Sequence, residues 1–438
     1  MPLFNRSSWP LRLAQGGVVV TFALIGLWLR LPGVPPLLPP LYVSRFVIFL
    51  PVLWTVFWWL AAGLPGLRDL RRDPHRRLWA LALLLLALWA FASQMWAFQR
   101  GPHPEVGATG ALQFGMAALF AVVCACAGPP RRYIVAALIA ALLTSALVAG
   151  LQVANQSALG LVALGEFGVT MQTPGVSVVQ AGDVRWLRPY GLMPHPNMLA
   201  GALLAGTLAA CALALSARRW LRWAGLAAAA AGLYALLLTF SRGAWVGLAA
   251  GGLIFTAVVW RAGLLRRALP LVLSLLAAGA LFTALYWPFV LARTGAGDET
   301  TEQRSMADRV VYTQFALQAV SEFPVLGVGI GNFPWRASYY LMFVGFDLRG
   351  DNVHNVYLSA WAELGTVGLG LLILALAAGT WAAIRALCAR PDPARAALFA
   401  GFAAFTVVGL FDHYPWTILH FQAAWWGLLA LAGTTESG

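Results

Sequence analysis

A histidine stands where a polar loop meets a long apolar run in the segment Asp351–Gly365. His354 closes the loop, and the apolar run that follows extends to about Ala383. Because imidazole is the side chain whose unperturbed pKa lies closest to neutrality, it can take up and return a proton at working pH. His354 is therefore the candidate for proton transfer where a membrane helix meets water.

Two arginines lie in turns that hold them near membrane depth. Arg188 precedes an apolar run in Arg188–Asn197, and Arg242 lies in Thr239–Gly243, where almost no loop joins two apolar runs. A charge held there is costly unless it is paired. Guanidinium groups match phosphate oxygens without a metal, so we predict that both arginines bind an anionic ligand. The alternatives are a side chain that snorkels to the interface and an ion pair with Asp412.

The turn before the next apolar run supplies two further candidates for substrate binding. Asn197 stands at the expected start of a helix, where it can cap the helix and where the backbone amides favour an anion. His195 is either a second functional histidine or a turn histidine bonded to the backbone. His413 and His420 flank the last outer turn and are not expected to be catalytic.

The first turns of the helix expected at His354 add three residues. His354, Tyr357 and Trp361 are spaced by three and four residues, so on a helix they share one stripe. Glu363 would lie more than two turns into the helix and be buried, where a carboxylate is usually paired. An arginine or a helix-end amide could be its partner, and the sequence is equally consistent with catalytic assistance and with structural pairing.

The composition is that of a membrane protein. The 438-residue chain is 61% hydrophobic and only 10% charged, whereas soluble domains are about 45–50% apolar. Several apolar runs approach or exceed the ~18–20 residues that span a bilayer. We therefore predict one all-α polytopic membrane domain over residues 1–438. The twelve expected transmembrane spans are 13–30, 42–62, 78–98, 108–127, 133–152, 197–216, 222–240, 243–260, 268–290, 355–384, 396–411 and 416–433.

The basic residues predict an orientation. All 29 are arginine, and with a cytoplasmic N-terminus eighteen of them fall in the inner loops. Every short inner loop is then basic, as the positive-inside rule requires. This topology places both termini inside and His354, Arg188 and Arg242 outside. Among the outer arginines, Arg100 and Arg293 are expected to be ordinary surface charge.

Two outer segments are long. The first, about 153–196, alternates at Val176–Val179 and favours a short hairpin. The second, about 291–354, is inserted between the ninth and tenth spans. It contains an expected amphipathic helix, Met306–Phe323, that would lie on the membrane or cap the bundle. Gly327–Gly331 is expected to form a tight turn rather than a phosphate loop, because no strand precedes it and no Lys-Ser/Thr pair ends it.

Several functional motifs are absent from the sequence. It has no Walker motif, no Asp-x-Asp pair, no His-Glu-x-x-His and no Gly-x-Ser-x-Gly. The four cysteines avoid the longer polar loops and predict no disulfide framework. The chain is therefore expected neither to hydrolyse a nucleotide nor to use a nucleotide-activated sugar.

Four motifs in chain order resemble the O-antigen ligase and polymerase superfamily. They are Arg188–Asn197 with Leu199-Ala200, the Ser241–Trp245 turn, Leu326–Phe333, and His354–Leu358 with Glu363–Gly365. The motifs cover roughly residues 180–370, and the twelve-span layout covers the whole chain. The resemblance implies a glycosyltransferase of the bacterial inner membrane that takes a glycan from undecaprenyl pyrophosphate on the periplasmic side. It also implies that His354 is catalytic and that Arg188 and Arg242 are essential.

On this resemblance, we expect an O-antigen ligase that passes the glycan to the lipid A–core of lipopolysaccharide. The transfer would be inverting, with no metal and no cofactor. Membrane lipids are expected partners and nucleic acid is not. Glu363 and Asp412 keep structural or undecided roles. The candidate substrate-binding residues are Arg45, His195, Asn197, Arg336, Arg349, Asn355 and Tyr357.

Three other activities stay open at this point. An O-antigen polymerase would pass the glycan to another lipid-linked repeat, and a protein O-oligosaccharyltransferase would pass it to a protein hydroxyl. A single long outer loop and no C-terminal soluble extension favour the ligase over the protein-glycosylating group. A flippase or transporter of another class would bind the same anion and move it without cutting it.

Overall fold

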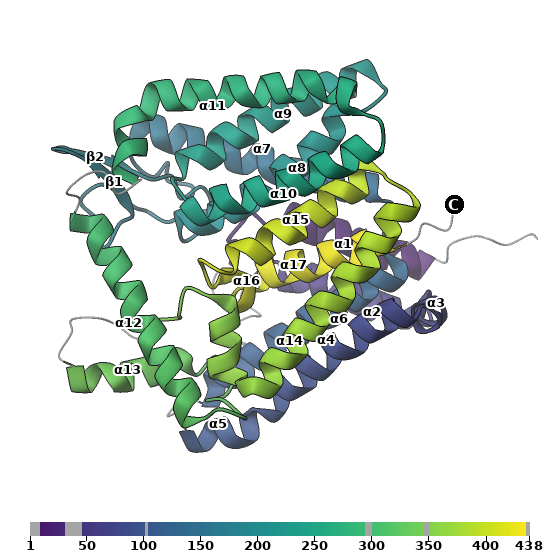
Figure 1. Ribbon diagram of the computed structural model, residues 1–438, viewed down its shortest axis with the longest axis vertical. Helices are drawn as coiled ribbons and strands as arrows, with labels where there is room; N and C mark the ends of the chain where they lie inside the picture. The colour runs from purple at the N-terminus through teal and green to yellow at the C-terminus, as the bar shows by residue number, and fades with distance from the viewer. Residues whose placement is uncertain (1–8, 31–45, 101–103, 294–299, 345–350, 435–438) are drawn as a thin grey trace, which may run out of the picture.

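The computed structural model describes residues 9–30, 46–100, 104–293, 300–344 and 351–434, and this part is built almost wholly from α-helices (Figure 1). The helices up to residue 238 are α1 (Trp9–Ala23), α2 (Phe49–Ala61), α3 (Leu67–Arg72), α4 (Pro74–Ala92), α5 (Gln94–Arg100), α6 (Pro104–Ala127), α7 (Arg131–Asn155), α8 (Pro196–Ala214) and α9 (Arg219–Leu238). Those that follow are α10 (Arg242–Arg261), α11 (Leu265–Arg293), α12 (Thr300–Glu322), α13 (Phe333–Val344), α14 (Val356–Ala389), α15 (Pro393–Val408), α16 (Tyr414–Thr417) and α17 (Leu419–Ala432). The all-α prediction is confirmed.

Each of the twelve expected spans corresponds to a helix. Among the described residues, eight helical stretches are long and apolar enough to cross a membrane by length and composition. They are Pro74–Ala97, Val106–Ala127, Arg131–Asn155, Pro196–Ala214, Arg219–Leu238, Arg242–Arg261, Leu265–Arg293 and Val356–Ala389. The other four expected spans correspond to the shorter helices α1, α2, α15 and α17.

The bundle has a central helix and a peripheral one. All 14 residues of α17 are buried, as expected for a helix that is apolar on every side. In α11 only 17% of the most apolar window is buried, and this helix lies along one edge in Figure 1. Pro270 and Pro288 lie inside α11, and Tyr286 leaves helical geometry there, which matches the kink that proline causes by removing a hydrogen bond.

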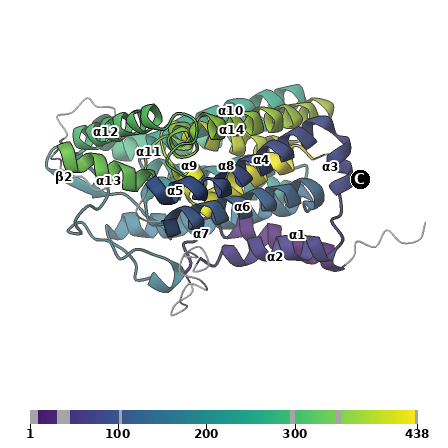
Figure 2. The ribbon, with the colours of Figure 1, turned by 90° about the horizontal axis from the view of Figure 1, so that it is seen from below.

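The two ends of the bundle differ. One end carries the hairpin of β1 (Val178–Ala181) and β2 (Val184–Leu187) together with α12 and α13, whereas α3 lies at the other (Figures 1 and 2). We call these the site end and the opposite end. The antiparallel hairpin confirms the strand signal. The amphipathic helix is also confirmed as α12, which packs on α13 and α14 at the site end and is followed by Pro324.

A glycine turn packs into a break in α14. Gly327, Gly329 and Gly331 all have positive φ, and Gly365 inside α14 has φ 67°. A Cβ added at Gly327 would lie 2.4 Å from the carbonyl of Glu363, so only glycine fits this approach. The expected tight turn is confirmed, and it holds the long outer segment against α14.

Candidate functional site

The His354 loop is fixed by the residue that caps α14. Asn355 is the N-cap, and its Oδ1 accepts the backbone N–H of Leu358 at 2.9 Å. Its Nδ2 donates to the carbonyl of Leu410 at 3.3 Å. His354 therefore lies just outside α14, and the expected stripe shared with Tyr357 and Trp361 is wrong for the histidine. In the structure, Asn355 positions the loop against the end of α15.

His354 faces a second loop, which joins α15 to α16. Its Nδ1 lies 3.5 Å from Oδ1 of Asp412, an ion-pair distance rather than a well-formed hydrogen bond. The imidazole rings of His354 and His413 are 5.4 Å apart between centroids. The side chain of His354 is 25% exposed and that of Asp412 is 10% exposed. A reactant can therefore reach the histidine while the carboxylate stays largely sheltered.

The surroundings of Asp412 keep it ionised. Burial by itself would raise the pKa of Asp412. The contact with His354 outweighs burial and holds the pKa well below its usual range. The backbone N–H of His413 also donates to Oδ1 at 2.9 Å. Asp412 is therefore a fixed negative charge beside His354.

Asn197 links this pair to Arg188. Nδ2 of Asn197 donates to Oδ2 of Asp412 at 2.7 Å, and Oδ1 of Asn197 accepts from Nη2 of Arg188 at 2.7 Å. Contacts therefore run without a gap from Arg188 through Asn197 and Asp412 to His354. Three separate segments supply these four residues at the site end: the turn into α8, the loop before α14 and the loop between α15 and α16.

Arg188 is buried and makes several contacts within the protein. Its Nε donates to the carbonyl of Thr239 at 2.6 Å, and its Nη1 donates to Oγ of Ser177 at 2.7 Å. Its side chain is only 5% exposed. Because carbonyls at a helix C-terminus have no partner within the helix, the bond to Thr239 stabilises the end of α9. The same bond holds the turn that leads to Arg242.

A second arginine holds that turn. Nη2 of Arg293 donates to the carbonyl of Phe240 at 2.9 Å, and Nη1 of Arg242 donates to the carbonyl of Arg293 at 3.2 Å. Phe240 has a φ of 50°, which is uncommon for a residue with a side chain. The expectation that Arg293 is ordinary surface charge is wrong, because the residue supports a strained turn.

His195 is an acceptor in the turn before α8. It is the N-cap of this helix, and its Nδ1 accepts the backbone N–H of Asn197 at 3.1 Å. Desolvation lowers the pKa of His195 to about 3, and the charge of Arg188 adds to the effect. The ring is therefore neutral at neutral pH and shapes the turn that carries Asn197.

Arg336 lies in a cluster between α12 and α13. It forms an ion pair with Glu322, and its Nε donates to the hydroxyl of Tyr340 at 3.0 Å. The rings of Phe323 and Tyr339 lie 5.3 and 4.8 Å from its guanidinium carbon. These contacts join the two outer helices, and a role for Arg336 in substrate binding stays a prediction.

Glu363 is buried among hydrogen-bond donors. Its Oε2 accepts from Nε1 of Trp416 at 2.9 Å, and the backbone of Gly331 and Phe333 also bonds to the carboxylate. The side chain is 1% exposed. The partner is thus a helix-end amide rather than an arginine, and Glu363 ties the glycine turn to α14.

The remaining candidates lie elsewhere or outside the described residues. The hydroxyl of Tyr357 donates to the carbonyl of Thr406 at 2.8 Å, which joins α14 to α15. Arg45 and Arg349 fall in the stretches outside the described residues. A contribution of these three to substrate binding stays a prediction.

One group near the site has the composition of a metal site. His354, Asp412 and His413 each offer one ligand atom, and these atoms lie within 4.8 Å of one another. Nδ1 of His413, however, is 2.8 Å from Oγ1 of Thr417. The connection to Arg188 also brings a fixed positive charge into the neighbourhood, which disfavours a divalent cation. The group could hold a metal, but its surroundings favour the ion pair.

The comparisons with known proteins bear on one part of the chain. Residues 227–373 match the family model described as O-antigen ligase. Among curated proteins, none matches the chain. The matched range includes Arg242 and His354, whereas Arg188 and Asp412 lie outside it. Arg242 and His354 thus lie within the range that matches the O-antigen ligase family model, which confirms the resemblance for the three motifs inside that range, whereas Arg188–Asn197 lies outside it.

Proposed function

We propose that the protein transfers a glycan from undecaprenyl pyrophosphate to the lipid A–core of lipopolysaccharide by an inverting, metal-independent reaction. The observation that carries the proposal is the unbroken line of contacts from Arg188 through Asn197 and Asp412 to His354. It joins a proton acceptor to the turn that presents a second arginine. Such a transfer needs both parts, because a proton must be removed from the acceptor and charge must be stabilised on the leaving group.

His354 acts as the general base. With the carboxylate of Asp412 beside Nδ1, the imidazole carries its proton on Nδ1 and presents the lone pair of Nε2 to the acceptor hydroxyl. The acceptor oxygen attacks the anomeric carbon as its proton passes to Nε2. The bond from the anomeric carbon to the pyrophosphate oxygen breaks on the opposite face. Asp412 orients the ring and stabilises the imidazolium that forms.

Arg242 and the start of α10 receive the pyrophosphate. Arg242 is the first residue of α10, and the N-cap Ser241 makes no side-chain capping bond. The N-terminus of this helix therefore carries no side-chain cap from Ser241, and the helix dipole adds to the charge of Arg242 in favouring an anion. Since Arg188 is buried among its own partners, its role in the proposal is to position the α9–α10 turn and to hold Asn197.

An apolar cavity beside α10 suits the polyprenyl tail. It has a volume of about 430 Å³ and is lined by residues of α8, α9, α10 and α11. Trp245, one turn after Arg242, lies on its wall together with Leu236 and Phe255. A carrier lipid in this cavity would bring its pyrophosphate to the start of α10. The carrier would then stay in the apolar phase while its glycan projects toward His354.

The orientation of the protein in the proposal follows from charge. The loops at the opposite end carry arginines such as Arg72, Arg131 and Arg385, and basic loops favour the cytoplasmic side. The site end is then periplasmic, in the bacterial inner membrane. The pyrophosphate-linked donor supplies the driving force there, so no nucleotide is needed.

The test is a turnover assay in detergent with lipid-linked glycan and lipopolysaccharide core as the only substrates. The ligase produces glycosylated lipopolysaccharide. Longer lipid-linked glycan with unchanged lipopolysaccharide would instead identify a polymerase. Movement of the carrier across a vesicle membrane without any covalent change would identify a transporter. Boiled protein and a reaction without donor serve as controls for carry-over of labelled glycan.

A further inference from the structure

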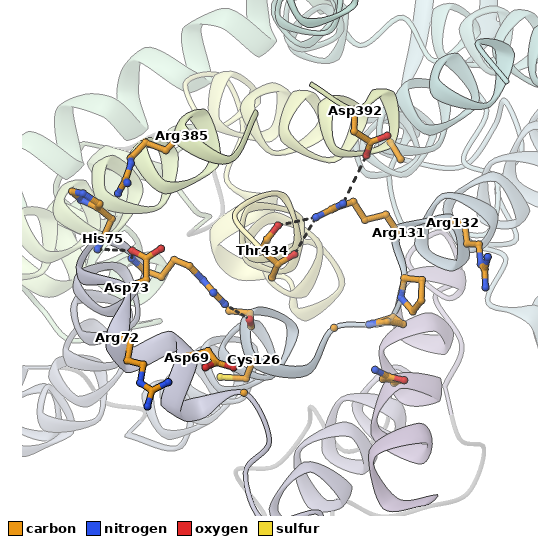
Figure 3. Close-up of a pocket in the computed structure, with 18 of the residues that line it drawn as sticks. Asp69, Arg72, Asp73, His75, Cys126, Arg131, Arg132, Arg385, Asp392 and Thr434 are labelled. Atoms are coloured by element: carbon orange, nitrogen blue, oxygen red, sulfur yellow. Dashed lines mark hydrogen bonds and ion pairs between the residues drawn. The ribbon is translucent and has the colours of Figure 1, made fainter. Parts of the chain in front are cut away.

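A large polar cavity lies beside α3, at the opposite end of the bundle, and Figure 3 shows the side chains that line it. Its volume is about 1330 Å³, above the ~300–1,000 Å³ of a typical small-molecule pocket. Its walls come from α3 and the start of α4, the α6–α7 turn, the α14–α15 turn and Thr434 beyond α17. Segments far apart in sequence thus build one basin.

The basin is basic. Five arginines line it against three aspartates, with His75 beside them. The arginines are Arg72, Arg76, Arg131, Arg132 and Arg385, and the aspartates are Asp69, Asp73 and Asp392. The lining therefore carries an excess of positive charge even when His75 is neutral.

Two of the three aspartates are already used as helix caps. Oδ1 of Asp73 accepts the backbone N–H groups of His75 and Arg76 at 3.0 and 3.2 Å. Oδ2 of Asp392 accepts the backbone N–H of Arg395 at 2.9 Å. Asp392 also forms an ion pair with Arg131 at 3.8 Å, so these two carboxylates offset the helix N-termini and Arg131 but neither Arg72 nor Arg385.

The helix ends around the basin add to its positive character. The first turns of α4, α7 and α15 all lie on its walls, and helix N-termini carry partial positive charge. The opposing carbonyls are already bonded: Arg76 donates to Ala125, and Nη2 of Arg131 donates to Thr434 at 2.7 Å. The negative ends are thus satisfied from within the protein.

Two arginines of the lining remain for a ligand. Within the part of the chain that the structure describes, Arg72 and Arg385 make no side-chain hydrogen bond and no ion pair, and both are exposed. They lie at the C-terminal ends of α3 and α14 respectively. Arg72 and Arg385 therefore come to the basin from two different helices, as Figure 3 shows.

We propose that this basin binds a phosphate-bearing anion. The anion is the headgroup of a membrane phospholipid that carries more than one phosphate. Guanidinium groups and helix N-termini are the usual protein partners of phosphate. Basic pockets between transmembrane helices on the cytoplasmic side suit acidic lipid headgroups. The volume admits a headgroup with two phosphates, which would join helices α3, α7 and α14. A soluble pyrophosphate shares the same chemistry.

The basin is separate from the glycan-transfer site. His354 precedes α14 and Arg385 lies in its last turns. At about 1.5 Å per residue, a helix of this length spans the bilayer even with the break at Gly365. The lipid site consequently does not depend on the reaction at His354, and its test needs no turnover.

The experiment measures binding to the purified, delipidated full chain by native mass spectrometry and by thermal shift. The probes are cardiolipin, phosphatidylethanolamine and inorganic pyrophosphate. We expect cardiolipin to bind and raise the melting temperature, with phosphatidylethanolamine far weaker. The variant Arg72→Gln/Arg385→Gln should weaken cardiolipin binding about tenfold or more, since each arginine near an anionic surface contributes a severalfold factor.

The matched control is Arg266→Gln/Arg267→Gln. It removes the same charge from exposed positions in α11 that do not line the basin. Cardiolipin affinity in this control should stay within about twofold of wild type, as surface charges act weakly at a distance. If pyrophosphate binds with the same dependence on Arg72 and Arg385, the basin is still a phosphate-binding site, but its ligand is a soluble anion rather than a lipid headgroup. Equal loss in both variants, or equal binding of cardiolipin and phosphatidylethanolamine, would overturn the proposal.

Discussion

Nδ1 of His354 lies 3.5 Å from Oδ1 of Asp412, although the two residues come from different loops. One loop closes the long outer segment before α14, and the other joins α15 to α16. The pair is held on both sides, by Asn355 at the start of α14 and by Asn197 at the start of α8. A fixed carboxylate beside a partly exposed imidazole is an arrangement that favours one tautomer and one ring orientation.

The variant Asp412→Asn should therefore slow transfer. It keeps an acceptor for the backbone N–H of His413 and removes the negative charge beside His354. We expect kcat to fall on the order of 10²-fold, within the usual contribution of general-base catalysis. The double variant with His354→Ala should be no slower than His354→Ala alone, because the two residues act as one unit. If the losses of kcat in the two single variants multiply in the double variant, His354 and Asp412 do not act as one unit.

Arg188 and Arg242 should respond differently to lysine. Arg188→Lys loses the fork that bonds Thr239, Ser177 and Asn197, and we expect it to destabilise the protein by about 2–4 kcal/mol. Arg242→Lys should change stability by about 1 kcal/mol or less, because its side chain is only half-buried. Its kcat should nevertheless fall about tenfold. Thermal unfolding together with kinetics separates the two, and equal melting temperatures would contradict the positioning role of Arg188.

The stability of the protein should depend on His195 in mildly acidic solution. The pKa of His195 is about 3 in the folded protein, against about 6.5 in an unfolded chain. As the pH falls below 6.5, the unfolded state gains a proton that the folded state refuses. Stability is therefore full above pH 6.5 and declines toward pH 3, by up to about 1.4 kcal/mol per pH unit.

The matched variant for this effect is His195→Asn, which keeps a capping acceptor for α8. Thermal unfolding at pH 7.5 and pH 5 should show a larger loss in wild type than in the variant, by about 2 kcal/mol at most. His413, whose pKa is also lowered by burial, is present in both proteins and cancels in the difference. Parallel curves for the two proteins would contradict the neutral, buried state of His195.

Chelation tests whether the His354, Asp412 and His413 group holds a metal during turnover. We expect full transfer in excess EDTA, because arginine and helix amides receive the pyrophosphate in the proposed mechanism. His413→Gln should likewise keep most of the activity, since it leaves the His354–Asp412 pair in place. A strict requirement for a divalent metal, lost together with His413, would replace that mechanism with a metal-assisted one.

Hydrophobic runs and charge were sufficient to predict the helices. Each expected span became a helix because runs of this length can satisfy their backbone only internally in a bilayer. The ends were less well defined: the tenth helix begins at Val356, after His354, because the N-cap Asn355 has extended backbone geometry. Because the helix begins two residues after His354, the histidine lies off the helix and beside Asp412.

The assembly of the site could not be predicted from the sequence. Arg188, Asn197, Asp412 and His354 meet through packing of α8, α14 and α15, and the distances between loops leave no trace in local spacing. The role of Arg293 was missed for the same reason. Its partner is the carbonyl of Phe240, which is distant in sequence and adjacent only in the folded protein. Sequence motifs pointed to His354 and Arg242, and both residues lie within the range that matches the family model.

The most direct test of the proposed reaction is transfer by purified His354→Ala protein, measured with lipid-linked glycan and lipopolysaccharide core. His354 is partly exposed and lies in a loop, so the variant should fold and melt as wild type does. Transfer should fall by about 10²–10⁴-fold, the usual contribution of a general base. Retention of more than about a tenth of wild-type transfer would contradict the assignment of His354 as the catalytic base.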